Sequence, residues 1–189
     1  MQKYIYIVAL LIFSFESFAT RTFDGAYTGI GLAYSYTNVR IDNQTYGAKT
    51  AYFNFFGGQG FIRNDIYYGL EGSLHSDQFS KKVDGKRLTK FFGLSASARI
   101  GRIIEENFLP YFKLGLRRDV YSLKKANPDD RFASMMIVPS VGVDAFVEDW
   151  FLIRSEVEYG MGFDNNGAEK SISRKPRTLL VRAGALLKF

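Results

Sequence analysis

The 189-residue sequence contains no cysteine and only one histidine. The lack of cysteine excludes a disulfide framework, a Cys-based zinc site and a thiol nucleophile, and a single histidine excludes a multi-His metal centre. Long apolar runs are also scarce: the N-terminus has one, and one run cannot build a helical membrane bundle. What the chain does contain is 18 glycines, 16% aromatic residues and a net charge of +6 at a mean hydropathy of −0.10. An apolar share of 47% excludes wholesale disorder.

The N-terminus has the pattern of an export signal. Lys3 precedes an apolar stretch over residues 5–15, and Ser17-Phe18-Ala19 forms a small-x-small cleavage site. We therefore expect residues 1–19 to be a secretory signal peptide and residues 20–189 to be one mature domain; the alternative is an uncleaved anchor helix. Export into an oxidising compartment also accounts for the absence of cysteine.

The mature chain alternates apolar and polar residues with a period of two. In residues 25–38, for example, Ile30, Leu32 and Tyr34 share one face, while Tyr27 and Gly31 lie on the other. The same pattern recurs and predicts eight strands at 25–38, 49–60, 66–75, 88–101, 109–121, 132–147, 150–162 and 178–189. Most approach or exceed the 9–11 residues that a tilted membrane strand needs.

A soluble β-sandwich is the alternative for this pattern. Its strands usually run about 5–6 residues, which is shorter than those expected here. In addition, no helix or second layer is predicted that could cover the apolar face. A closed barrel with lipid outside and a polar interior satisfies both faces and every backbone group. We therefore predict an all-β fold, a closed eight-stranded antiparallel up-and-down transmembrane β-barrel.

The predicted connections alternate in length. Long links span residues 38–48, 76–87, 122–131 and 163–177, whereas the links at 61–65, 102–108 and 148–149 are shorter. Outer-membrane barrels have short periplasmic turns and longer outer loops. The rhythm predicts four extracellular loops and two periplasmic termini in the outer membrane.

Four segments are distinctive: GAYTGIG at 25–31, YGLEG at 68–72, PYFKLGL at 110–116 and a last strand that ends in Phe189. With them the chain resembles the eight-stranded outer-membrane β-barrel family that includes opacity-type surface antigens and the OmpA-like transmembrane domain. The resemblance spans the mature chain and implies a small monomeric barrel that serves membrane structure and surface contact. It also implies that Phe189 is the insertion signal read by the barrel-assembly machinery. Its motifs identify the architecture better than the activity.

Charged residues on the inner face predict an ion-pair network that fills the lumen. An eight-stranded barrel is just wide enough for side chains to fill, and charges buried there must pair. The predicted network comprises Glu71, Arg99, Lys113, Arg117, Asp144, Arg154, Glu156, Glu158 and Arg182, with Asp119 and Lys188 on the same face. Glu71 and Arg99 are expected to pair across neighbouring strands. The alternative is a narrow polar conduit.

The basic residues concentrate in the long links, and the short turns are acidic. We expect outer-loop contacts from Lys81, Lys82, Lys86, Arg87, Lys124, Lys125, Arg174 and Lys175. These side chains could simply be solvated on exposed loops, or they could bind anionic lipopolysaccharide or a host-surface ligand. Nucleic acid is not expected as a partner, because these residues lie on separate loops of an exported protein.

Chemistry-bearing motifs are weak. His75-Ser76-Asp77 offers a histidine and a hydroxyl, but adjacent strand residues point to opposite faces, so a lipid A-modifying enzyme is the less favoured hypothesis. Asp129-Asp130 and 164–166 lack a calcium-loop spacing. We expect no cofactor, no metal and no enzyme activity.

Pro139 is expected to mark a bulge or an off-register segment. The function predicted is adhesin-like surface contact, and the alternative is a narrow-pore porin.

Overall fold

The computed structural model describes residues 22–41, 44–76, 78–83, 86–124, 129–163 and 176–189. The expected signal peptide at 1–19 lies outside these ranges. Within them the chain is all β, in nine strands: β1 (Gly25–Ile41), β2 (Gln44–Arg63), β3 (Ile66–His75), β4 (Phe79–Val83), β5 (Lys86–Arg102), β6 (Phe108–Lys124), β7 (Asp129–Glu148), β8 (Phe151–Gly162) and β9 (Arg177–Lys188). None of the described residues forms a helix that could cross a membrane.

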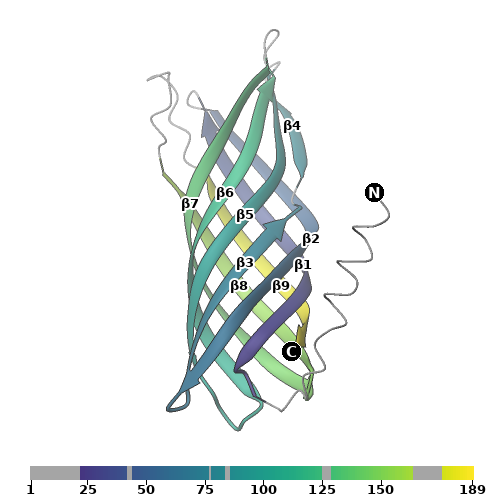
Figure 1. The fold of residues 1–189 in the computed structure, drawn as a ribbon. Helices are drawn as coiled ribbons and strands as arrows, with labels where there is room; N and C mark the ends of the chain where they lie inside the picture. The colour runs from purple at the N-terminus through teal and green to yellow at the C-terminus, as the bar shows by residue number, and fades with distance from the viewer. Residues whose placement is uncertain (1–21, 42–43, 77, 84–85, 125–128, 164–175) are drawn as a thin grey trace, which may run out of the picture.

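The nine strands close into a barrel with eight strand positions around its wall, because β3 and β4 share one position (Figure 1). Every neighbouring pair is antiparallel, in the order β3-β2-β1-β9-β8-β7-β6-β5, and β3 also pairs with β5 to complete the ring. The short strand β4 pairs with residues 86–90 of β5 and follows β3, which pairs with residues 93–102, along the same side of β5. The predicted closed eight-stranded antiparallel barrel is therefore confirmed.

Side chains follow the predicted alternation between a lipid-facing surface and the lumen. The eight residues Phe151–Glu158 of β8, for instance, alternate between outward positions such as Ile153 and buried positions such as Arg154. Outward positions carry large apolar side chains that stay exposed, such as Leu32 and Leu70. In a membrane these side chains face acyl chains, and the closed ladder satisfies the backbone polar groups between them.

One end of the barrel carries the short turns, and we call it the short-turn end. Asn64 and Asp65, between β2 and β3, both have positive φ (52° and 61°), as the two central residues of a type I′ hairpin turn do. Glu105 and Glu106 adopt similar values after β5. The C-terminus lies at this end, where the Phe189 N–H donates to the Ala26 carbonyl at 3.0 Å.

The opposite end, which we call the hairpin end, differs from the prediction. Residues expected in three long loops instead extend the strands, so that β2 and β7 each reach 20 residues. The β1–β2 ladder runs up to the pair Ile41–Gln44, and the β6–β7 ladder up to Lys124–Asp129. The two strands of an antiparallel ribbon pair their backbone groups with each other, so a hairpin can continue without a third strand.

The strand ladders shift register at two places, beside Phe91 in β5 and beside Val147 in β7. Phe91 is an extra residue in β5, and the register against β6 shifts there, so Phe91 and Phe92 are both exposed. At Pro139 the expected shift is wrong. β7 keeps one register against β6 along its length and one register against β8 from Met136 to Phe146, although the β8 ladder skips Pro139 and Val138. A proline lacks the N–H for one ladder bond, and this local gap is absorbed without a bulge.

Candidate functional site: the charged lumen and the hairpin end

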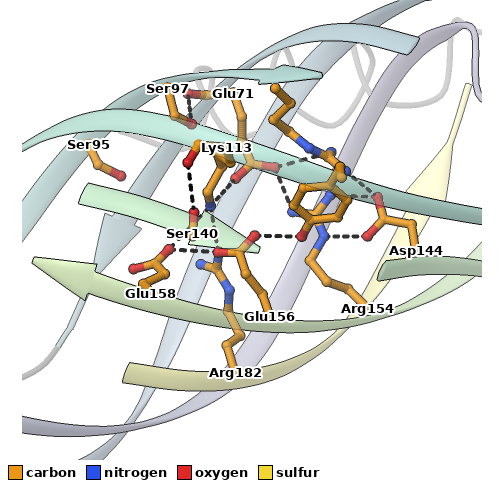
Figure 2. Close-up of polar contacts among 12 residues, drawn as sticks. Glu71, Ser95, Ser97, Lys113, Ser140, Asp144, Arg154, Glu156, Glu158 and Arg182 are labelled. Carbon is orange, nitrogen blue, oxygen red and sulfur yellow. Dashed lines mark hydrogen bonds and ion pairs between the residues drawn. The ribbon is translucent and has the colours of Figure 1, made fainter. Parts of the chain in front are cut away.

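A layer of eight buried charged side chains crosses the lumen (Figure 2). We call it the charged layer. The four cations balance the four anions, which is the condition for burying ions at tolerable cost. The members come from β3 and β5 to β9, and each is at most 5% exposed: Glu71, Arg99, Lys113, Asp144, Arg154, Glu156, Glu158 and Arg182.

Arg154 organises one half of the charged layer. Its Nε and Nη2 donate to the two oxygens of Asp144 at 2.7 and 2.9 Å, and its Nη1 donates to Glu71 Oε2 at 2.5 Å. Arg99 Nη2 donates to the same Asp144 carboxylate at 2.7 Å. The expected pair of Arg99 with Glu71 is separated by 3.6 Å. Both carboxylates therefore face two guanidinium groups.

Lys113 links this half to the other. Its ammonium lies 3.2 Å from Glu71 Oε1, 2.6 Å from Glu156 Oε1 and 3.2 Å from Glu158 Oε1. Arg182 contacts Glu156 and Glu158 through Nη2, the latter at 3.1 Å. Three carboxylates thus share one ammonium, and all eight charged groups form one continuous network.

Two tyrosines complete the network, and the sequence alone did not identify them. The Tyr27 hydroxyl donates to Glu71 Oε2 at 2.9 Å and accepts from Arg99 Nη1 at 2.9 Å. The Tyr111 hydroxyl donates to Glu156 Oε2 at 2.5 Å, and its ring lies 3.8 Å from the Arg99 guanidinium carbon. Stacking on aromatic rings is a favourable environment for a desolvated guanidinium.

Glycines make room for these rings. A Cβ at Gly142 would lie 2.5 Å from the Tyr111 hydroxyl, and one at Gly58 would lie 2.6 Å from the Tyr27 hydroxyl. Contacts this short do not occur with real side chains, so Gly58 and Gly142 are positions where a tyrosine side chain packs directly against the backbone. Sequence periodicity places these glycines inside but cannot say which ring each accommodates.

An apolar cluster fills the lumen between the charged layer and the short-turn end. Buried apolar residues pack into one cluster there: Phe23, Tyr27, Phe56, Tyr67, Leu109, Phe146, Leu152 and Leu186. The rings of Phe23 and Phe146 are 4.5 Å apart. The cavity beside them is about 10 Å³, which is about the space of one water molecule. The charged layer and this apolar cluster fill successive levels of the lumen.

A second ion cluster, centred on Asp119, occupies the lumen nearer the hairpin end. Lys90 Nζ donates to Asp119 Oδ2 at 2.7 Å, Arg117 Nε donates to Asp119 Oδ1 at 2.8 Å, and the Tyr121 hydroxyl donates to Oδ2 at 3.1 Å. Arg117, predicted as part of the network, therefore belongs to this cluster. Lys90 was missed, because the extra residue Phe91 reverses the inside–outside phase above it. The adjacent aromatics at 91 and 92 were the available signal.

The basic residues expected in loops lie mostly in strands. Lys82 and Arg87 are exposed cross-strand partners of the β4–β5 hairpin. Lys81 and Lys86 belong to the same hairpin, and Lys124 ends β6. Lys125, Arg174 and Lys175 lie outside the described residues.

The candidate catalytic motif is divided. His75 is buried inside the barrel rather than at a rim, with Nε2 3.1 Å from Ser95 Oγ and its ring 6.3 Å from the Tyr52 ring. Ser76 is exposed, and its hydroxyl donates to the Phe53 carbonyl. Asp77 and the 164–166 motif lie outside the described residues, whereas Asp129 and Asp130 begin β7. Among the described residues no group of three or more His, Asp or Glu side chains is arranged to hold a metal ion.

Comparison with known proteins agrees with this architecture. No family model matches the chain. The 25 kDa outer-membrane immunogenic protein of Brucella abortus is 26% identical over 175 residues, which cover 87% of this chain and 78% of that protein. The Brucella suis protein matches to the same extent.

Solved structures show the same fold. Neisserial surface protein A matches with a TM-score of 0.60 at 16% identity, covering 88% of this chain and all of its own. Yersinia pestis Ail, solved with a heparin analogue, matches with a TM-score of 0.54 at 17% identity, covering 86% and 99%. The sequence relatives and these neighbours are similar to this chain along nearly its whole length. The resemblance to the eight-stranded outer-membrane β-barrel family is therefore confirmed at the level of the fold.

Proposed function

We propose that this chain is a monomeric surface protein of the bacterial outer membrane, with a filled lumen and an adhesin-like role at its hairpin end. The observation that carries the proposal is the pair of layers across the lumen, the charged layer and the apolar cluster behind it. A barrel filled at two levels serves as a scaffold, so its contacts with other molecules are made by what it displays.

The orientation belongs to the same proposal. The hairpin end would face outward, and both termini and the acidic turn residues Asp65, Glu105 and Glu106 would face the periplasm, in line with short periplasmic turns in this class. Phe189 would be the residue through which the assembly machinery recognises the last strand. Its position beside the first strand, bonded to Ala26, is compatible with recognition at barrel closure.

The proposed ligand is an anionic surface, either lipopolysaccharide or a host glycan. Lys49, Lys82 and Arg87 are exposed at the hairpin end. Contacts between exposed charges weaken as salt rises, because the Debye length falls from about 10 Å at 0.1 M to about 3 Å at 1 M. The heparin analogue bound to Ail is a polyanion of the expected kind, although that contact is a property of Ail.

Two measurements test this function. Cells that display the chain should bind immobilised heparin or host cells, and Lys82→Gln with Arg87→Gln should reduce binding at least threefold, whereas Arg63→Gln with Arg102→Gln at the short-turn end should not. Equal binding by the two double variants would reject the hairpin end as the contact surface. In planar bilayers the proposed plug gives no discrete conductance steps. Regular steps, increased by Glu71→Gln, would instead establish the narrow-pore function.

A further inference from the structure

The barrel wall divides between β2 and β4 at the hairpin end. The β2–β3 ladder ends at the pair Asn54–His75, and a last backbone bond joins Ser76 N–H to the Phe53 carbonyl at 3.3 Å. Above this point, within the described part of the chain, β2 has a ladder only with β1, and β4 only with β5. We call the space between residues 45–51 of β2 and 79–83 of β4 the β2–β4 seam.

The register shows which backbone groups face the seam. In an antiparallel ladder alternate residues direct their N–H and C=O groups to opposite edges, and the pairs that flank a two-residue connection bond to each other. Those flanking pairs are Ile41–Gln44 and Val83–Lys86. Counting from them, alternate residues of β2 from Thr45 to Ala51 face the seam. On the other side, Ser80 and Lys82 of β4 do so. Two strand edges therefore offer their hydrogen-bonding groups toward the same space.

This space is a cavity with mixed walls. Its volume is about 410 Å³, and it is lined by Tyr36, Gly47, Ala48, Lys49, Phe79 and Ser80. The aromatic side chains supply apolar surface, and Phe79 is anchored by an edge-on contact with the Tyr121 ring at 6.4 Å. Backbone donors and acceptors beside apolar side-chain pockets are what an extended peptide uses when it binds a sheet edge.

The charges around the seam select the peptide. Lys49 and Lys82 are exposed on the two sides, and Arg87 lies directly opposite Lys82 in the β4–β5 hairpin. Like charges directly opposite each other are unfavourable, so an anionic neighbour would relieve the repulsion. Lysines on a free edge also disfavour pairing with other strands, because an ammonium group loses hydration against a neutral strand and meets like charge on a basic one. An acidic strand escapes this penalty.

We propose that the β2–β4 seam binds an acidic, extended segment of a partner polypeptide by strand addition. The proposal deepens the surface-contact function and rests on the outward orientation of the hairpin end. It differs from the glycan contact in requiring backbone hydrogen bonds, which a polyanion without a peptide backbone cannot replace.

A matched pair of variants at Ser80 tests the proposal in the refolded full-length chain. The probe is a fluorescent ten-residue peptide of alternating Glu and Val, and its anisotropy reports binding. Ser80→Pro removes an N–H that faces the seam, whereas Ser80→Ala keeps that N–H and, like proline, loses the hydroxyl contact with Thr89 at 3.2 Å. We expect at least tenfold weaker binding for Ser80→Pro and less than a twofold change for Ser80→Ala.

A second measurement covers the case in which proline disturbs β4. The chain has no cysteine, so Lys49→Cys with Ser80→Cys can be bridged by a short bismaleimide across the seam. Bridging should abolish peptide binding relative to the same protein capped with a monofunctional maleimide. Equal peptide binding by bridged and capped protein would overturn the proposal, as would equal binding by the two Ser80 variants.

Other outcomes identify other occupants. If the chain forms a dimer without peptide and Ser80→Pro dissociates it, the seam binds a second copy of the chain. If anionic lipid vesicles compete with the peptide and both Ser80 variants still bind the vesicles, the seam binds lipid. Either result overturns the peptide proposal. Heparin binding measured on the same samples separates the two proposals. Loss of peptide binding with intact heparin binding supports strand addition, and the seam proposal survives an absence of heparin binding.

Discussion

Replacing Arg154 with methionine removes the cation with the most hydrogen bonds in one half of the charged layer. The guanidinium makes two bonds to Asp144 and one to Glu71, all between 2.5 and 2.9 Å, and is 2% exposed. Breaking a buried ion pair by removing one partner costs about 3–5 kcal/mol. Asp144 keeps Arg99 and Glu71 keeps Lys113, so we expect the low end, about 3 kcal/mol of unfolding free energy.

Charge balance predicts what a second substitution does. Arg154→Met leaves three cations facing four anions, and Asp144→Asn alone leaves four facing three. The double variant restores three of each. Since the two residues are also directly opposite in the β7–β8 register, their effects should couple, with the double variant less destabilised than the sum by about 0.5–3 kcal/mol.

The measurement is urea unfolding of the barrel refolded in detergent micelles. Trp150 is the only tryptophan, so its fluorescence reports the transition, and the mobility of unheated samples on a gel confirms the folded fraction. Arg102→Met is the matched control, because Arg102 is exposed at the short-turn end and should change stability by no more than about 0.5 kcal/mol. If Arg154→Met and Arg102→Met had the same stability, the charged layer would not be what stabilises the lumen.

Three further predictions use the same assays. Gly58→Ala should destabilise the barrel by about 1–3 kcal/mol, because its Cβ would overlap the Leu70 carbonyl, whereas Gly72→Ala, with 4.0 Å of room, should be neutral; equal effects would contradict the packing. Deleting Phe91 should leave Lys90 inside the barrel and Phe92 outside, because their partners Tyr121 and Val120 are already consecutive in β6, so the unfolding free energy should change by no more than about 0.5 kcal/mol; a loss of about 3 kcal/mol or more would refute the bulge. Phe189→Ala should reduce assembly in cells but not refolding in micelles; unimpaired assembly would remove its proposed signal role.

The strand faces could be read from the sequence because the side-chain period of a strand is two and the two environments differ strongly. Glu71 and Arg154 could be placed inside for this reason, since either would be costly in lipid. The lengths of β1 and β2 could not be read from the sequence. Beyond the lipid, apolar and polar positions no longer differ in cost, so the alternation fades while the backbone ladder continues to Ile41 and Gln44.

Partners inside the lumen were also beyond sequence reasoning. Arg154 and Glu71 are 83 residues apart and lie on strands that are not neighbours. Their contact depends on the stagger of all the strands around the barrel, which no local pattern encodes. The same holds for Tyr111, whose hydroxyl reaches Glu156. Only the pairs on adjacent strands, such as Glu71 with Arg99, follow from neighbouring positions.

The lumen contacts solve a problem that the lipid face leaves open. A shift of one residue between neighbouring strands would turn apolar side chains inward, but a shift of two keeps every apolar residue toward lipid. The register must therefore be chosen inside. Asp144 lies opposite Arg154, and a two-residue shift of β8 would place it opposite Glu156 or Leu152 instead.

The register between β8 and β9 is fixed in the same way. Glu156 lies opposite Arg182 in the β8–β9 register, and a two-residue shift would replace that cation with Leu180 or Gly184. A charge without its partner in the lumen costs several kcal/mol, whereas the correct register pairs every charge in the layer. Charged residues at these inner positions thus discriminate between registers that an apolar lumen would accept equally, and this is the physical reason we infer for an ion-paired interior in so narrow a barrel.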